Sequence, residues 1–216
     1  MDKQLIKLIK QKRNNAYNDP QSILGKYDEY LEKNGIYHSV NEEVFFASIK
    51  GKKNLCDFTL SMIYEAIYDN EKEFLLNCLL QMGYESDSLV EIVLDIFKEQ
   101  KQNKNLWNYA DFLYSLKNYK YLDEYIKIIM DKRYGTSREM LILLVGESKM
   151  EKVVPYLVKL SSDVEVVGHT LVALSNYVND EIIAIMKTYT KHKKKWISDV
   201  ANKYLKDNYQ TIKEQL

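Results

Sequence analysis

The segment 148–178 carries two apolar stripes at helical spacing, separated by a short polar turn. In each stripe the apolar residues recur at every third or fourth position, which places them on one face of an α-helix. The first stripe contains Val153, Val154, Leu157 and Leu160, and the second contains Val167, Leu171, Leu174 and Val178. Neither helix can bury its stripe alone, so the pair must pack against further helices.

The same pattern recurs on both sides of this segment at an offset of about thirty residues. Leu141 and Leu144 align with Leu171 and Leu174, and similar stripes follow at 182–186 and 197–204. A period of roughly 30–45 residues built from helix pairs is typical of an α-solenoid. The sequence therefore predicts an all-α fold, an α-solenoid of antiparallel helix pairs that winds into an α-α superhelix.

The periodicity also predicts where the helices lie. The first helices are expected at 2–14, from Asp19-Pro20 to Lys33, and from Ser39 to Gly51, with Gly35 and Gly51 as helix ends. The remaining ones are expected at about 55–69, 71–83, 88–101, 105–118, 120–132, 137–147, 149–161, 164–178, 180–190 and 194–207. We expect one domain, with N-terminal capping helices in 1–53, degenerate repeats in 54–118, clearer repeats in 119–207 and a frayed tail in 208–216.

Five pairs of the form Ser/Thr-x-x-Glu stand near the expected helix starts and predict capping boxes. They are Ser39/Glu42, Ser88/Glu91, Thr136/Glu139, Ser148/Glu151 and Ser162/Glu165. Pro155 falls inside the helix expected at 149–161, where it removes a backbone donor and predicts a bend in the helix axis.

The stretch KVVPYLVKLSSDVEVVGHTLVAL, residues 152–174, resembles a HEAT repeat, with a proline in its first helix, a short loop containing Asp163 and a second helix of small and aliphatic residues. The resemblance covers about 119–207 well and 55–118 moderately, and it extends to small bacterial HEAT-repeat proteins. It implies an armadillo-like superhelix whose second helices line the concave face. HEAT-repeat proteins have many functions, so the resemblance concerns the fold.

Composition and charge limit the classes of function. The chain has 31 Lys and Arg against 31 Asp and Glu, so its net charge does not attract nucleic acid. Cys56 and Cys78 have no metal-ligand or pairing pattern, and we expect both to be reduced core thiols in a cytoplasmic protein. The start of the chain does not have the form of a signal peptide, and no apolar run reaches the length of a membrane span. The basic helix at 2–14 is expected to cap the solenoid, with a membrane-surface or partner helix as the alternative.

No catalytic, cofactor or metal motif is evident, and none of these is expected. We expect instead a recognition strip on the concave face, formed by Trp107, Arg138, Glu139 and His169 near the starts of successive second helices. The alternative is that Arg138 and Glu139 serve a helix start and that His169 is an edge residue. Gly168 lies inside a helix, where glycine costs ~1 kcal/mol relative to alanine, so we expect close packing or a close partner there.

The densest run of like charge is Lys191, Lys193, Lys194 and Lys195, interrupted by His192 and followed by Trp196. These lysines are candidate phosphate-binding residues, for nucleic acid or an anionic lipid. Their other interpretation is a solvated turn between helices, where cations favour a helix C-terminus.

These observations favour a non-enzymatic module that binds a protein partner on its concave face, as an inhibitor, an immunity protein or a regulatory docking protein. The alternative is a nucleic-acid-binding protein or an enzyme. Trp107 and Asp111, one helical turn apart, are similar to the aromatic and carboxylate pair of HEAT-like alkylpurine DNA glycosylases. A basic groove around Trp107 would favour that alternative, and a mixed or acidic groove would favour protein binding.

Overall fold

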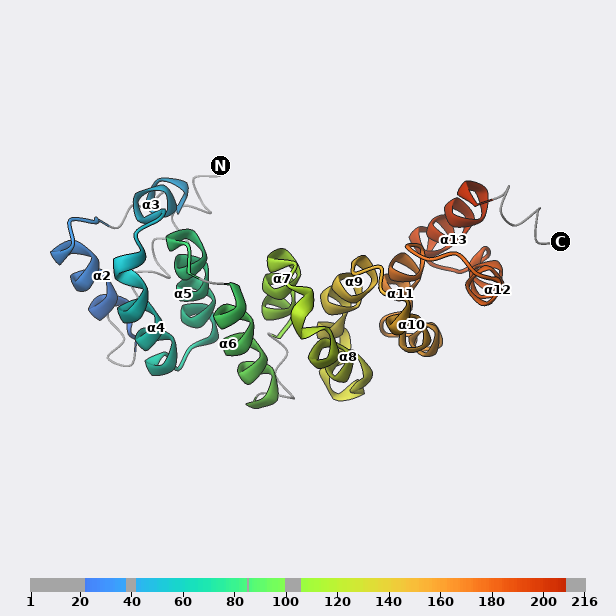
Figure 1. The fold of residues 1–216 in the computed structure, drawn as a ribbon, viewed down its shortest axis with the longest axis horizontal. Coiled ribbons are helices and arrows are strands. Elements are labelled where there is room, and N and C mark those ends of the chain that lie inside the picture. Colours follow the sequence, from blue (N-terminus) through green and yellow to red (C-terminus); the bar gives the residue numbers. More distant parts are fainter. Residues whose placement is uncertain (1–21, 38–41, 85, 100–105, 209–216) are drawn as a thin grey trace. The chain divides into compact units, whose positions relative to one another are not determined.

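The computed structural model describes residues 22–37, 42–84, 86–99 and 106–208, and every regular element in these ranges is a helix (Figure 1). This confirms the predicted all-α class. The α-helices of the N-terminal part are α2 Leu24–Lys33, α3 Glu42–Ile49, α4 Cys56–Glu65, α5 Asp69–Met82 and α6 Ser86–Glu99. Those that follow are α7 Leu106–Leu116, α8 Leu122–Met130, α9 Glu139–Glu147, α10 Val154–Leu160, α11 Val167–Leu174, α12 Asp180–Tyr189 and α13 Lys195–Asp207.

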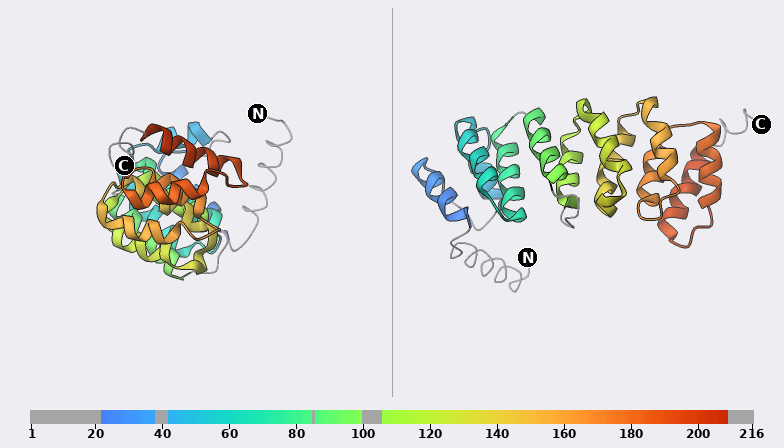
Figure 2. Two further views of the ribbon diagram at one scale, coloured as in Figure 1. Left: turned by 90° about the vertical axis from the view of Figure 1, so that its right-hand side faces the viewer. Right: turned by 90° about the horizontal axis from the view of Figure 1, so that it is seen from below.

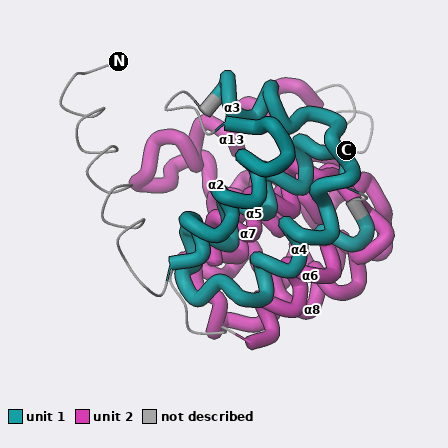
Figure 3. Tube along the Cα trace, turned by 90° about the vertical axis from the view of Figure 1, so that its left-hand side faces the viewer, with its two compact units in different colours: residues 1–89 teal, residues 90–216 magenta. Residues whose placement is uncertain are grey.

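The chain divides into two compact units, Met1–Leu89 and Val90–Leu216 (Figure 3). In the first unit, α4 and α3 both pack on α5. Aromatic rings also pack in this unit: Tyr30 of α2 stacks on Phe58 of α4 with ring centroids 3.8 Å apart, and Phe45 of α3 stacks on Phe74 of α5 at 5.6 Å.

Both cysteines are free and buried in this first unit, as predicted for core thiols. Burial raises the pKa of the Cys78 thiol to about 12. The neighbouring hydroxyl of Tyr27 lies 3.0 Å from Thr59 Oγ1, and Thr59 in turn donates to the Leu55 carbonyl. These two buried hydroxyls are therefore paired, as a buried hydroxyl requires, whereas the buried Glu71 Oε2 on α5 has no hydrogen-bond partner among the described residues.

The second unit consists of two rows of helices (Figure 1; Figure 2). The odd row is α7, α9, α11 and α13, in which each helix packs on the next. The even row is α8, α10 and α12; α8 packs on α9, α10 on α11 and α12 on α13. From α8 onward, each predicted helix pair thus contributes one helix to each row, while α6, most of which also belongs to this unit, precedes the rows. The apolar stripes of residues 153–174 are buried between the rows, but Val178, expected on the second stripe, is 45% exposed.

Tyrosine hydroxyls tie consecutive pairs together. Tyr134 donates to the Phe97 carbonyl at 3.1 Å, and Tyr177 donates to the Gly146 carbonyl at 3.2 Å. Further along, Tyr204 donates to the Tyr177 carbonyl at 3.0 Å, and Tyr189 to the Ser161 carbonyl at 2.6 Å. The bonded residues are 27 to 37 positions apart. Each ring fills a space between helices, and its hydroxyl satisfies a carbonyl at a helix end.

Helix ends agree with the sequence better than helix starts do. Gly35 and Gly51 both adopt positive φ after α2 and α3, as expected of residues that end helices. The predicted capping boxes are not formed in the described residues. Ser88 lies inside α6, α9 and α11 begin after Arg138 and Val166 without a side-chain cap, and the Ser148 hydroxyl donates to the Val145 carbonyl at the end of α9.

The side-chain caps that do form are on asparagine and aspartate. Asn179 Oδ1 accepts from the Ile182 amide at 2.9 Å and caps α12. Asn118 and Asp131 cap short 3-10 helices at Tyr119–Tyr121 and Lys132–Arg138. Two more such helices, Lys53–Leu55 and Glu151–Val153, precede α4 and α10. Pro155 consequently lies in the first turn of α10, where its missing N–H breaks no helical hydrogen bond. The proline therefore marks the start of a helix, and the bend that the sequence predicted inside a longer helix does not occur.

The expected helix at 2–14, the Asp19-Pro20 start and Ser39 of the Ser39/Glu42 pair lie outside the described residues, as does the tail from 209 onward. Among the residues that the structure does describe, no helix is both long and apolar enough to cross a membrane.

Candidate recognition face

The candidate site is the exposed side of the odd row in the second unit, which we call the recognition face. It contains exposed side chains of α7 and of the start of α13, and the half-buried side chains of Glu139 on α9 and His169 on α11. Trp107 on α7 is 40% exposed and Trp196 on α13 is 45% exposed, which is high for such large apolar side chains. Two half-exposed tryptophans on one row of helices give this face the residue type that dominates protein interfaces.

Three side chains from consecutive helices of the row form a chain of contacts. His169 Nδ1 on α11 lies 3.4 Å from Glu139 Oε1 on α9. On its other side, the His169 ring meets Trp196 of α13 edge to face, with centroids 5.8 Å apart. Glu139 and His169 are both half-buried, so the pair keeps its geometry while one edge faces solvent. The structure therefore brings together two of the four predicted strip residues.

Trp196 was missed by sequence reasoning, although two signals pointed to it. It follows the lysine run directly, and it is the neighbour of Ile197, which aligns with Gly168 and His169 in the repeat. The structure also gives the reason for Gly168: the Trp196 indole packs against its backbone. Of the two explanations expected for this glycine, close packing within the chain is the one observed.

Arg138 does not belong to an exposed strip, because its side chain is fully buried. Its guanidinium donates to Asp163 Oδ2 at 3.0 Å and Glu165 Oε2 at 3.3 Å, and to the carbonyls of Gly135 and Ile129 at 2.7 and 3.2 Å. Arginine is suited to this position because its planar fork reaches several acceptors at once. The expectation that Arg138 is an exposed recognition residue is wrong; it holds the loop before α11 against the end of α8.

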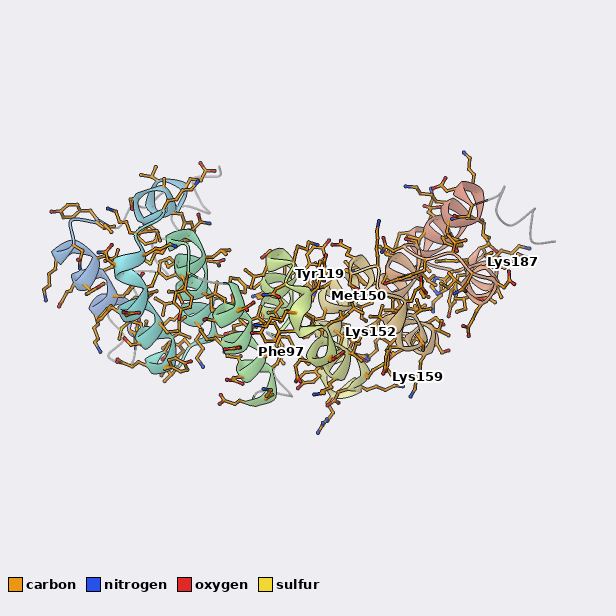
Figure 4. The ribbon with its side chains drawn as sticks, in the orientation of Figure 1. Phe97, Tyr119, Met150, Lys152, Lys159 and Lys187 are labelled. Carbon is orange, nitrogen blue, oxygen red and sulfur yellow. The ribbon has the colours of Figure 1, made fainter. Side chains whose placement is uncertain are left out.

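Trp107 and Asp111 are exposed and lie one turn apart on α7, as the glycosylase alternative requires. The charge around them differs from that of a DNA groove. The helices α7, α9 and α11 contain no lysine or arginine, whereas Asp111, Glu139 and Glu147 are acidic. By contrast, the even row carries an exposed lysine in the last turn of each helix, namely Lys127, Lys159 and Lys187. Figure 4 labels Lys159 and Lys187 among them. A phosphate backbone laid along α7, α9 and α11 would meet no lysine or arginine of these helices, whereas α13 carries Lys195, Lys203 and Lys206.

The four lysines of the run, Lys191, Lys193, Lys194 and Lys195, are all exposed at the turn between α12 and α13. The run does not end α12, since that helix stops at Tyr189; instead Lys194 is the N-cap of α13 and its side chain makes no capping bond. The lysines therefore do not form the last turn of α12, as the interpretation of cations at a helix C-terminus requires. They lie at the positive end of the α13 dipole, where an anion would be stabilised.

No cluster of three or more His, Cys, Asp or Glu side chains with metal-binding geometry occurs in the described residues. In the second unit, Asp163 and Glu165 pair with Arg138, Glu139 lies 3.4 Å from His169, and His192 Nδ1 accepts from the Lys194 amide. No protein-family model, curated protein or solved structure matches this chain.

Proposed function

We propose that this chain is a non-enzymatic, HEAT-like α-solenoid that binds a protein partner through the recognition face of its second unit. Support for the repeat architecture comes from the two rows of helices and from tyrosine hydrogen bonds that join residues 27 to 37 positions apart. An array in which each helix pair contacts its neighbours is how solenoids build extended binding surfaces.

The observation that carries the binding proposal is the contact chain Glu139–His169–Trp196 on a row whose helices α7, α9 and α11 lack cations. An exposed aromatic, a carboxylate and an imidazole held in fixed geometry make directional contacts with a protein surface. Aromatic anchors carry much of the energy of such interfaces. The proposed role is that of an inhibitor, immunity or regulatory protein that acts by docking, in the cytoplasm, where the free thiols Cys56 and Cys78 stay reduced.

Binding to nucleic acid is the less supported alternative. Proteins that hold DNA neutralise phosphates with lysine and arginine, and specific or non-specific affinity depends on those contacts. Trp107 and Asp111 are present and exposed, but the helix that carries them, LWNYADFLYSL, has no basic residue.

The test uses the full-length chain as bait for proteins of its native host, with cross-linking and mass spectrometry. Trp107→Ala and His169→Ala alter the recognition face, and Tyr156→Ala on the even row is the matched control, since Tyr156 is 41% exposed and Trp107 is 40% exposed. Loss of one captured protein with both face variants and its retention with Tyr156→Ala is the expected result. Capture that survives both face variants would remove the proposed face. Base release from alkylated DNA that depends on Asp111, tested with Asp111→Asn, would favour the glycosylase instead.

A further inference from the structure

A small pocket of about 220 Å³ lies where the loop before α11 meets the turn between α12 and α13. Its floor is apolar, because Val167 and Ile197 are buried core residues that face it. Val164 forms one wall and is 83% exposed, the highest exposure of any large apolar side chain in the described residues. The remaining lining residues are Ser162, Tyr189, His192, Lys193 and Lys194.

The rim of this pocket is cationic. Lys193 and Lys194 line it, and Lys191 and Lys195 stand beside them, all exposed. The ion pairs found in the described residues do not include any of these four lysines. The carboxylates of the facing loop are Asp163 and Glu165, and both are bound to Arg138, whose single positive charge balances one of the two. The positive charge of the rim is therefore left for a ligand.

The size and chemistry of the pocket limit what fits. Small-molecule sites usually measure ~300–1,000 Å³, so a pocket of about 220 Å³ suits one side chain of a larger molecule. A bare phosphate would leave the Val164, Val167 and Ile197 surface in contact with water. An aliphatic side chain would cover that surface and gain the free energy of removing it from water.

We propose that this pocket binds a peptide segment of a partner protein in which one aliphatic residue is flanked by carboxylates. The aliphatic side chain enters between Val164 and Ile197, and the flanking carboxylates pair with Lys193, Lys194 and their neighbours. The proposal rests on the proposed function in one respect, that the partner is a protein. It assigns to that partner a chemical signature and a second point of attachment, formed by residues other than Glu139, His169 and Trp196.

The test is a titration of the isotope-labelled full-length chain, followed by nuclear magnetic resonance. The probe is the acetylated and amidated pentapeptide Glu-Asp-Leu-Asp-Glu, and its control replaces the leucine by serine. Shifts at Val164, Val167, Lys193 and Ile197 that saturate with the leucine peptide are expected. The serine peptide should bind about ten-fold more weakly, because the apolar burial is lost. Equal binding of the two peptides would overturn the role of the apolar floor.

Charge is tested with matched double variants, one in the turn before α13 and one on α13 itself. Lys193→Glu with Lys194→Glu should weaken leucine-peptide binding by ten-fold or more. Lys203→Glu with Lys206→Glu makes the same change of charge farther along α13, at exposed positions outside the pocket, and should leave binding within about two-fold. Val164→Asp should also prevent the leucine side chain from entering the pocket, and residue 164 is so exposed that this substitution should not disturb folding. Unchanged binding in the first variant, or equal loss in the second, would refute a localised site.

Two further probes test whether the pocket binds a phosphate group in preference to the carboxylates of a peptide. Inorganic phosphate, and vesicles in which half of the phospholipid is anionic, are titrated against the same resonances. Saturation of the pocket residues by either probe at lower concentration than the peptide would overturn the peptide assignment in favour of a phosphate site. The peptide titrations contain no host partner and leave the recognition face unaltered, so their failure is distinguishable from failure of the proposed function.

Discussion

The indole of Trp196 occupies the space that a side chain at residue 168 would fill. A Cβ built on Gly168 would lie 1.8 Å from Trp196 Cη2 and 2.4 Å from Cζ2. The helix α11 can approach α13 this closely only because residue 168 is glycine. One helix earlier the same relation recurs, since a Cβ on Gly146 would lie 2.5 Å from the Cβ of Ala173 on α11.

Gly168→Ala should therefore displace Trp196 and destabilise the second unit by ~1–3 kcal/mol, the range for overpacking a tight interior. Urea unfolding followed by tryptophan fluorescence measures the free energy, and a shifted emission maximum before unfolding reports the displaced indole. Gly25→Ala is the control: it is also helical, has open space around it, and should be neutral or gain up to ~1 kcal/mol from helix propensity. Equal effects of the two substitutions would contradict the close approach.

Replacing Arg138 should lower the free energy of unfolding, whereas replacing an exposed residue would change it little. Arg138→Met leaves Asp163, whose side chain is 8% exposed, without its partner, and breaking a buried pair in this way costs ~3–5 kcal/mol. Arg133→Met is the control, because the Arg133 side chain is 60% exposed and its pair with Asp131 should contribute less than ~1 kcal/mol. Thermal and urea unfolding of both variants measure this difference, and a melting temperature unchanged in Arg138→Met would refute it.

Leu174→Ala should destabilise the chain by roughly 2–5 kcal/mol, the range for truncating a leucine in a packed core. Leu174 is fully buried at the end of α11, on the apolar stripe that the sequence predicted. Val164→Ala removes apolar atoms from a solvent-exposed position in the same pair and should change the free energy by less than ~0.5 kcal/mol. A loss well under 1 kcal/mol at residue 174 would mean that the core lies elsewhere.

The stability of the second unit should fall in acid, in part through Glu147. Burial acts to raise the pKa of Glu147, but hydrogen bonds from Lys117 and Tyr114 outweigh it and bring the pKa below its usual value. A carboxyl whose pKa is lower in the folded state stabilises the fold above its unfolded pKa of ~4.3, and loses this contribution as the pH falls through the folded pKa.

Comparison of the wild type with Glu147→Gln isolates this contribution. The difference in unfolding free energy between them should be largest near pH 6 and should shrink as the pH is lowered below ~4.3. Asp123, whose pKa is lowered by Lys152, titrates in both proteins and so cancels in the difference. A difference that stays constant from pH 6 to pH 2.5 would show that Glu147 contributes nothing through its charge.

The sequence was a good guide to which segments are helical and a poor guide to how they begin. The spacing of apolar residues reflects which positions are buried along a whole helix, so it locates helices well. The predicted helices 180–190 and 194–207 agree with α12 and α13 to within two residues at each end. The Ser-x-x-Glu pattern is short and recurs by chance. At Ser148 the hydroxyl bonds backward to the Val145 carbonyl, and a 3-10 turn at Glu151–Val153 delays the start of α10 beyond the residue that was expected to cap it.

The site residues show a similar limit. Arg138 has a long side chain that can lie exposed or buried, and its burial depends on Asp163 and Glu165, which are 25 and 27 residues away. A periodic pattern indicates which face of a helix is apolar, but it gives no information on ion pairs formed across a loop. His169 and Glu139 were expected in one strip because the repeat aligns them, and the structure places them in contact.

The tyrosine hydrogen bonds also indicate how the second unit folds during its synthesis. Each of the four hydroxyls finds its carbonyl within 37 residues along the chain, at Phe97, Gly146, Tyr177 and Ser161. Closing a loop of that length costs little more entropy than closing one of half the length, about 0.6 kcal/mol per doubling. Chains whose contacts are this local fold quickly. At a synthesis rate of ~5–20 residues per second, each new helix pair can pack on the preceding pair within seconds of leaving the ribosome. Its apolar surface is therefore exposed to water only briefly, before the rest of the chain has been made.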